Sequence, residues 1–157
     1  MRILVLGIGN VLMNDDAAGV RVVQALAEKY SFPDEVTLLD GGTLGLGLLP
    51  DLEGVDRLLV VDAVATGGAI GSLVRLSGAD IPRTLATKVS PHQVGLKDLL
   101  LVAELQGHAV AEMVLWGVQP GSIDMDIEMS PEVAAAVDLL QDKVLEELAV
   151  WGILPLP

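Results

Sequence analysis

Three side chains that could act together on a metal ion are spread widely along this sequence: Asp16, Asp62 and His92. Two carboxylates and one imidazole supply three protein ligands and leave coordination positions open, as expected when a metal must also meet water or a substrate. The chain has no cysteine, which excludes thiolate metal sites, cysteine nucleophiles and disulfides. Oxygen and imidazole ligands suit zinc, nickel and manganese, and ligand softness does not choose among these ions.

The two aspartates also have ordinary structural interpretations. Asp16 stands where a helix begins, and an acid there commonly serves as an N-cap or first-turn residue worth about 1 kcal/mol. Asp15 fits that role equally well, so that if one of the two acids caps the helix, the other is free for a ligand. Asp62 ends a buried apolar strand, and its carboxylate therefore needs a partner that offsets the cost of desolvation.

Only two histidines are present. His92 lies in the segment Lys88-Val-Ser-Pro-His-Gln, where Pro91 stiffens the backbone ahead of a helix. A lone loop histidine is usually a surface residue or a helix cap. His108 has no acidic companion suggested by the topology, which makes His92 the better candidate ligand.

Hydrophobic patterning predicts the elements that would position these residues. Short apolar runs rich in Val, Leu and Ile are typical of strands buried on both faces, and apolar residues at helical spacing indicate amphipathic helices. Ser130, Pro131 and Glu132 mark the start of a long helix as N-cap, N1 and first-turn acid. The expected strands are residues 2–7, 35–40, 57–63, 72–76 and 113–118, the expected helices are residues 17–30, 43–52, 93–105 and 131–148, and residues 155–157 form a tail.

These elements predict an α/β fold, a three-layer α/β/α sandwich formed by residues 1–157 as a single domain. Right-handed crossovers give a five-stranded, mostly parallel sheet with the order 2-1-3-5-4. The link into residues 72–76 is too short for a parallel crossover, so strand 4 is expected to be antiparallel. Ligands bind beyond the carboxyl ends of such strands, between strands 1 and 3, where Asp16 and Asp62 should face one another. Glycine clusters at residues 41–47 and 67–71 are expected to form mobile loops near these strand ends.

Composition narrows the class of partner. With 22 acidic and 9 basic residues the formal net charge is −13, which disfavours nucleic acid and anionic membranes as partners. No run approaches the roughly 18 uncharged apolar residues that span a bilayer, and the N-terminal apolar run lacks a cleavage site, so we expect a cytoplasmic protein.

Several common motifs are absent or broken. Gly7-Ile-Gly-Asn-Val-Leu12 begins like a dinucleotide-binding fingerprint, but Leu12 replaces the third glycine or alanine. A nucleotide-binding α/β protein is therefore a weak alternative. No Walker A motif, His-Glu-x-x-His or Gly-x-Ser-x-Gly is present.

Four separated motifs together resemble the nickel–iron hydrogenase maturation endopeptidases, in particular the branch that processes uptake hydrogenases. They are Gly7-Ile-Gly-Asn-Val-Leu-Met-Asn-Asp-Asp16, Asp40-Gly-Gly-Thr43, Val61-Asp62-Ala63 and Ser90-Pro-His-Gln93. The match follows the chain in order over nearly its whole length. The sequence differs from many relatives in having Ala17 and Ala18 after the paired acids, and some relatives have Glu at the position of Asp16.

The resemblance implies a metal-dependent, aspartyl-type endopeptidase that removes the C-terminal extension of the hydrogenase large-subunit precursor after nickel insertion. It implies that Asp16, Asp62 and His92 are the catalytic and metal-binding residues. The metal would be nickel supplied by the substrate, although other divalent metals could occupy the site. We further expect the segment Asp40, Gly41, Gly42 and Thr43 to admit the precursor's C-terminal peptide, with a simple tight turn as the alternative. A non-cleaving, nickel-sensing assembly factor or chaperone for the same precursor would use the same three residues.

Overall fold

The computed structural model describes residues 1–42, 45–78, 80–81, 91–121 and 128–157, and for residues 91–95 it describes the backbone alone. All statements below concern these parts of the chain. Within them no helix is long and apolar enough to cross a membrane, and the cytoplasmic location remains a prediction from the sequence.

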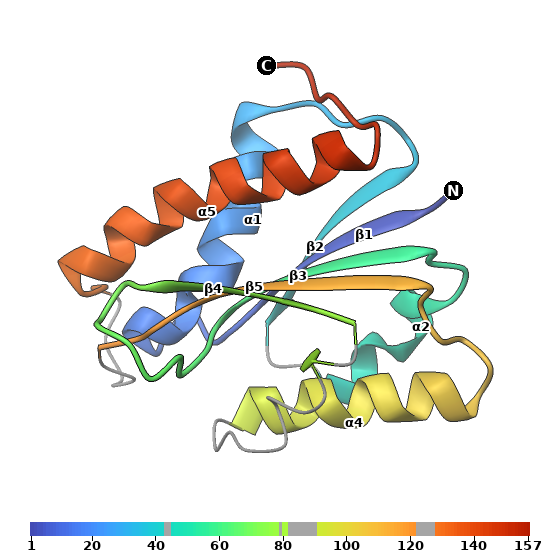
Figure 1. The fold of residues 1–157 in the computed structure, drawn as a ribbon, viewed down its shortest axis with the longest axis horizontal. Coiled ribbons are helices and arrows are strands. Elements are labelled where there is room, and N and C mark those ends of the chain that lie inside the picture. Colours follow the sequence, from blue (N-terminus) through green and yellow to red (C-terminus); the bar gives the residue numbers. More distant parts are fainter. Residues whose placement is uncertain (43–44, 79, 82–90, 122–127) are drawn as a thin grey trace.

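A five-stranded sheet forms the centre of the molecule (Figure 1), and its strand order is β2-β1-β3-β5-β4. The first four strands in this order run parallel, and β4 pairs antiparallel with β5, as predicted. The short link from β3 to β4 explains the antiparallel edge, because a parallel crossover needs a dozen or more residues. The strands are β1 (Ile3–Ile8), β2 (Val36–Gly42), β3 (Arg57–Ala63), β4 (Leu73–Ser77) and β5 (Glu112–Val118).

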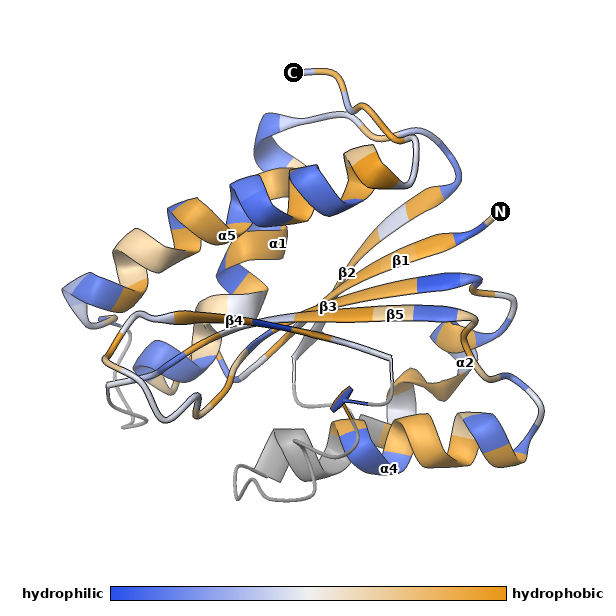
Figure 2. Cartoon of the chain, in the orientation of Figure 1, coloured by the Kyte–Doolittle hydropathy of each residue, from blue (hydrophilic) through white to orange (hydrophobic). Residues whose placement is uncertain are grey.

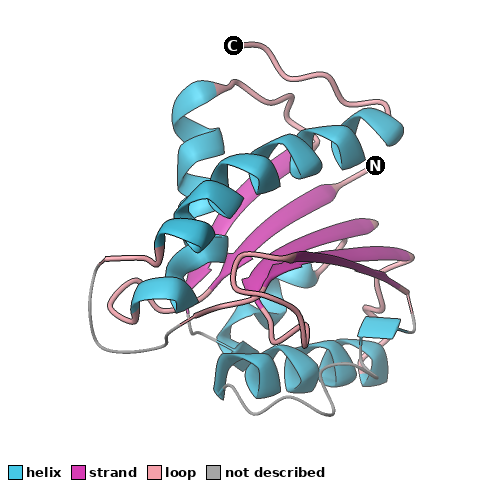
Figure 3. Cartoon of the chain, turned by 60° about the vertical axis from the view of Figure 1, so that its left-hand side comes forward, coloured by secondary structure: helices cyan, strands magenta, loops and turns pink. Residues whose placement is uncertain are grey.

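Helices cover both faces of this sheet (Figure 3), which confirms the three-layer arrangement. All six residues of β1 are buried, and its first four side chains alternate between two hydrophobic clusters. Ile3 and Val5 pack under α1 and α5, whereas Leu4 and Leu6 face α2 and α4. Figure 2 shows hydrophobic residues along most of the strands and a mixture of hydrophobic and hydrophilic residues along α1, α4 and α5, as expected of helices with one face on a sheet. The helices are α1 (Ala18–Lys29), α2 (Leu49–Leu52), α4 (Pro91–Leu105) and α5 (Pro131–Val150), and two 3-10 helices are η1 (Asn14–Ala17) and η2 (Gly45–Leu48).

The segment before β3 and the C-terminus differ from the sequence prediction. Within the helix expected at residues 43–52, the described residues 45–52 form η2 followed by the single turn of α2, because two glycines and Pro50 disfavour a continuous α-helix. Residues 155–157 are not a loose tail, since Leu156 forms an antiparallel bridge with Ser31 through two backbone hydrogen bonds of 2.7 and 3.0 Å.

Three helices begin at the edge where the parallel strands end. In Figure 1 the first turns of α1, α4 and α5 all lie at the left, next to the carboxyl ends of the strands. Because helix N-termini carry partial positive charge and free N–H groups, this edge suits carboxylates and other anions.

Candidate active site

The connection from β1 to α1 folds back tightly on the end of its own strand. Gly9 has a φ of 140°, and a Cβ atom added there would lie 1.9 Å from the carbonyl oxygen of Asp16. Only glycine permits this approach. Asn14 has a φ of 26° and begins η1, the 3-10 helix that contains Asp15 and Asp16.

Close packing of α1 on the sheet brings Asp16 to the edge that also contains Asp62. A Cβ atom added at Gly19 would lie 2.0 Å from the carbonyl oxygen of Val61 and 2.6 Å from that of Ile8. The first turn of α1 therefore rests directly on the ends of β1 and β3. Asp62 follows Val61 in β3, and Asp16 lies one turn ahead of Gly19. Asp62 is fully buried, and Asp16 is 4% exposed.

Of the two structural interpretations considered from the sequence, the N-cap of α1 is wrong for both Asp15 and Asp16, whereas both are first-turn acids of the 3-10 helix η1. The N-cap of α1 is Ala17, and it makes no side-chain capping hydrogen bond. Asp16 Oδ2 instead accepts a hydrogen bond of 3.1 Å from the backbone N–H of Asn10. Both acids belong to η1, one element earlier than the capping prediction assumed.

The Asp15 carboxylate accepts hydrogen bonds from residues more than 100 positions later in the chain. Its Oδ1 accepts a 2.7 Å hydrogen bond from the backbone N–H of Ser130, and its Oδ2 accepts bonds of 2.7 Å from the Ser130 hydroxyl and from the N–H of Gly121. Ser130 is the N-cap of α5 as predicted, but its hydroxyl donates to Asp15 rather than capping the helix.

His92 is the second residue of α4, and α4 begins on the side of the sheet where the parallel strands end (Figure 1). Its side chain is outside the described part of the structure. The sequence placed His92 in a loop before the helix, whereas α4 begins at Pro91, in the first-turn position that proline tolerates well.

The predicted substrate segment lies on the neighbouring strand. Asp40, Gly41 and Gly42 are the last residues of β2 rather than a loop, and Thr43 is outside the described residues. Asp40 Oδ1 accepts a 3.0 Å hydrogen bond from the N–H of Gly42, which has a φ of 51°. The carbonyl of Gly42 accepts a hydrogen bond of 3.0 Å from the N–H of Gly9, which extends the contact between β2 and the loop after β1.

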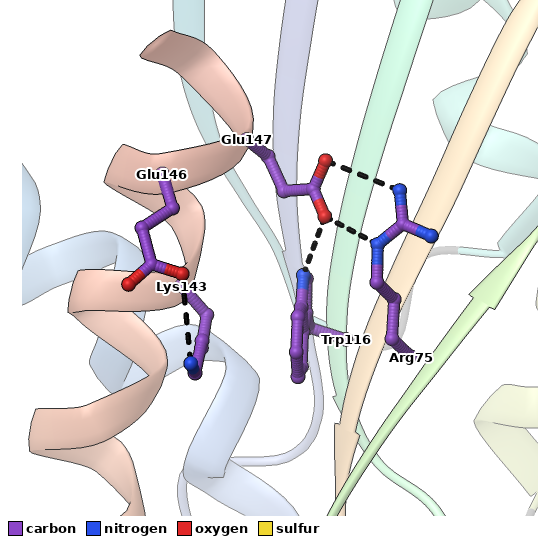
Figure 4. A network of polar contacts seen from close by, with 5 residues as sticks. All are labelled: Arg75, Trp116, Lys143, Glu146 and Glu147. Atoms are coloured by element: carbon purple, nitrogen blue, oxygen red, sulfur yellow. Dashed lines mark hydrogen bonds and ion pairs between the residues drawn. The ribbon is translucent and has the colours of Figure 1, made fainter. Parts of the chain in front are cut away.

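A second polar cluster holds α5 on the sheet (Figure 4). Glu147 Oε1 accepts hydrogen bonds from Arg75 Nε and, at 3.1 Å, from the indole N–H of Trp116, while Oε2 accepts from Arg75 Nη2 at 3.3 Å. The hydrogen bond from Arg75 lowers the pKa of the Glu147 carboxyl, with help from Trp116 and against the opposing effect of burial. Lys143 lies 5.7 Å from the centre of the Trp116 ring. This cluster joins α5 to β4 and β5 and has a structural role.

The sequence and fold of this chain match those of known proteins. The family model described as "Hydrogenase maturation protease" matches residues 20–147. The chain is 40% identical to the hydrogenase 2 maturation protease of Escherichia coli over 100% of its own length and 96% of that protein. It belongs to the hydrogenase maturation protease family. It is also 44% identical to the hydrogenase expression/formation protein HupD of Rhodobacter capsulatus, over 97% of this chain and 73% of that protein.

Solved structures of maturation proteases share the whole fold. The hydrogenase maturating endopeptidase HybD from E. coli superimposes with a TM-score of 0.96 at 40% identity, over 100% of this chain and 98% of that one. The maturation protease HybD from Thermococcus kodakarensis gives a TM-score of 0.78 at 33% identity, over 95% and 99%. This maturation protease is therefore a peptidase, a hydrolase of peptide bonds.

In this maturation protease, sequence reasoning missed the role of Gln119 and the main contact of Ser130. Gln119 Oε1 accepts hydrogen bonds from the backbone N–H groups of Thr66, at 2.6 Å, and Gly67, at 3.3 Å, and so fixes the connection after β3. A polar residue directly after a buried apolar strand is the signal that could have identified Gln119. Ser130 was identified as a helix cap, but no local pattern reveals that its hydroxyl bonds to Asp15.

Proposed function

We propose that this protein removes the C-terminal extension from the precursor of a nickel–iron hydrogenase large subunit, and that it acts after nickel has been inserted. Membership of the maturation protease family supports the protease activity, and the names of the uptake-type relatives support this class of substrate. The nickel ion belongs to the substrate in this proposal, so the precursor carries it into the site.

The observation that supports the site assignment is that two buried carboxylates lie on neighbouring elements, η1 and β3, at one sheet edge. Asp16 and Asp62 approach this edge from different elements, and α4 begins there with His92 in its first turn. Among the side chains that the structure describes, no group of three His, Cys, Asp or Glu residues could hold a metal, and the His92 side chain is not among them. Two carboxylates with one imidazole fit a divalent cation as a donor set.

In this proposal the residues of the chain hold and orient the precursor. Asp16, Asp62 and His92 would contact the nickel of the precursor and thereby fix the scissile peptide next to the carboxylates. A divalent cation lowers the pKa of a bound water and polarises a carbonyl oxygen, so a protein nucleophile is not required. The carboxylates can also accept the proton of an attacking water. The chain has no cysteine to serve as an alternative nucleophile.

The test compares nickel-loaded with nickel-free precursor. Each is mixed with the purified protein, and intact masses are recorded before and after incubation. Loss of one C-terminal peptide from the nickel-loaded sample alone supports the proposal. Cleavage of both samples would keep the protease and discard nickel as the trigger, whereas a stable complex without a mass change would favour the non-cleaving assembly factor.

Two variants in the same assay test the site. Asp62→Asn removes the charge of a buried carboxylate, and we expect cleavage to slow by roughly 100-fold or more. Asp142→Asn is the matched control, because it removes one negative charge from an exposed position on α5. Unchanged cleavage by Asp62→Asn would show that the site assignment is wrong.

A further inference from the structure

Asp15 is a buried carboxylate whose partners come from a distant part of the chain. It has no exposed surface, and three donors converge on it: the N–H of Gly121, and the N–H and hydroxyl of Ser130. Each donor lies 2.7 Å from a carboxylate oxygen, a length typical of strong charge-assisted hydrogen bonds. Such a set stabilises the ionised carboxylate despite its burial.

The donors lie on both sides of the connection between β5 and α5. Gly121 follows the end of β5, and Ser130 immediately precedes α5. One carboxylate therefore ties both ends of this connection to η1. The N-terminus of a 20-residue helix adds a favourable dipole, since α5 begins at this point.

The next residue in η1 is Asp16, and the two acids have different hydrogen-bond partners. Successive residues of a 3-10 helix point about 120° apart because there are three residues per turn. Asp15 accordingly bonds to the α5 side, whereas Asp16 Oδ2 bonds to the N–H of Asn10. A rotation of η1 that broke the contacts of Asp15 would also move the carboxylate of Asp16.

We infer that Asp15 is a positioning residue for peptide cleavage: its bonds to Gly121 and Ser130 fix η1 in the orientation that presents Asp16 to the substrate. This inference rests on the proposed function, in which Asp16 contacts the nickel of the precursor. Asp15 acts through Asp16 and does not itself touch the substrate. Its charge is satisfied by donors of the chain.

Two independent changes weaken the contact. Asp15→Asn keeps the size of the side chain, but its amide nitrogen cannot accept the hydrogen bonds that one carboxylate oxygen now receives. Ser130→Ala removes only the hydroxyl donor, and Ser130→Thr restores it. Asp142→Asn again serves as the exposed charge control.

The values of kcat and KM for nickel-loaded precursor are measured at a temperature where circular dichroism shows each variant to be fully folded. We expect kcat to fall at least tenfold in Asp15→Asn and two- to fivefold in Ser130→Ala, with KM within twofold of the parent. Ser130→Thr and Asp142→Asn should match the parent. In the free protein, the amide NMR resonance of Asn10, which donates to Asp16, should move in Asp15→Asn and Ser130→Ala but not in the two controls.

An Asp16→Asn variant separates the possible failures. If Asp16→Asn cleaves like the parent, the proposed role of Asp16 is wrong and the positioning inference fails with it. If Asp16→Asn is inactive while folded Asp15→Asn and Ser130→Ala keep the parent's kcat, only the positioning inference is overturned. Should Asp15→Asn fail to fold, the comparison of Ser130→Ala with Ser130→Thr decides the question alone.

Discussion

Replacement of Gly19 by alanine should separate the two halves of the active site. The added Cβ would lie 2.0 Å from the carbonyl oxygen of Val61 and 2.6 Å from that of Ile8. Both atoms belong to the backbone of buried central strands, so α1 has to move away by about 1 Å to reach an allowed contact. That movement would carry Asp16 away from Asp62.

The Gly19→Ala substitution changes the free energy of unfolding in two opposing ways. Overpacking at a rigid contact costs about 1–3 kcal/mol, whereas alanine stabilises a helix interior by up to about 1 kcal/mol relative to glycine. Because Gly19 lies in the first turn of α1 and not in the helix interior, alanine gains only part of this helix stabilisation. We therefore expect a net loss of about 1–2 kcal/mol in the free energy of unfolding. A displacement of about 1 Å at a catalytic group can lower the rate by about 100-fold.

Urea unfolding gives the stability change, and mass spectrometry of the precursor gives the cleavage rate. Gly78→Ala is the control: nothing lies within 4 Å of the added Cβ, but its φ of 55° costs about 1–2 kcal/mol for any residue with a side chain. It should lose comparable stability and keep its cleavage rate. A Gly19→Ala protein with the stability and rate of the parent would refute the argument from close packing.

Three further outcomes follow from other contacts. Because the folded state lowers the pKa of Glu147, the Glu147 carboxylate contributes fully to stability above its ordinary pKa of about 4.5. This contribution is lost as the pH falls through the lowered pKa. The difference in stability between the parent and Glu147→Gln, measured by urea titration, should therefore shrink between pH 7 and pH 3. Arg75→Met should lower the free energy of unfolding at pH 7 by about 1 kcal/mol in the same titration. The value is small because the Arg75 side chain is 44% exposed and water screens its ion pair with Glu147. No loss at all would mean that this ion pair does not stabilise α5. Gly42→Val forces a β-branched residue to a φ of 51°, which lowers stability. If the end of β2 contacts the precursor, a folded Gly42→Val protein should also cleave more slowly than the parent. Cleavage at the parent's rate would count against that role.

Local patterns were sufficient for most of the sheet. The buried apolar runs located β1 and β3, and the shortness of the link after β3 determined the direction of β4. The end of β2 was placed two residues too early, because Gly41 and Gly42 read as a turn although they continue the strand beside β1. Glycine weakens strand propensity, but pairing with a neighbouring strand outweighs it.

The roles of Asp15 and Asp16 could not be separated from the sequence. Capping rules are local, and both acids satisfy them equally. The donors that distinguish Asp15 are 106 and 115 residues away along the chain, so only the folded structure brings them to its carboxylate. Convergence of Asp16 and Asp62 on one edge was predictable, since it follows from strand order and right-handed crossovers.

The bridge between Ser31 and Leu156 fixes the C-terminus on the side of the molecule where α1 ends and the parallel strands begin. The N-terminus leads into β1 from this same side. Both ends of the chain therefore lie away from the edge that contains Asp16 and Asp62. An affinity tag, fluorophore or solid support attached through either terminus would leave that edge facing solution, which makes the protein suitable for immobilised binding measurements with a large precursor.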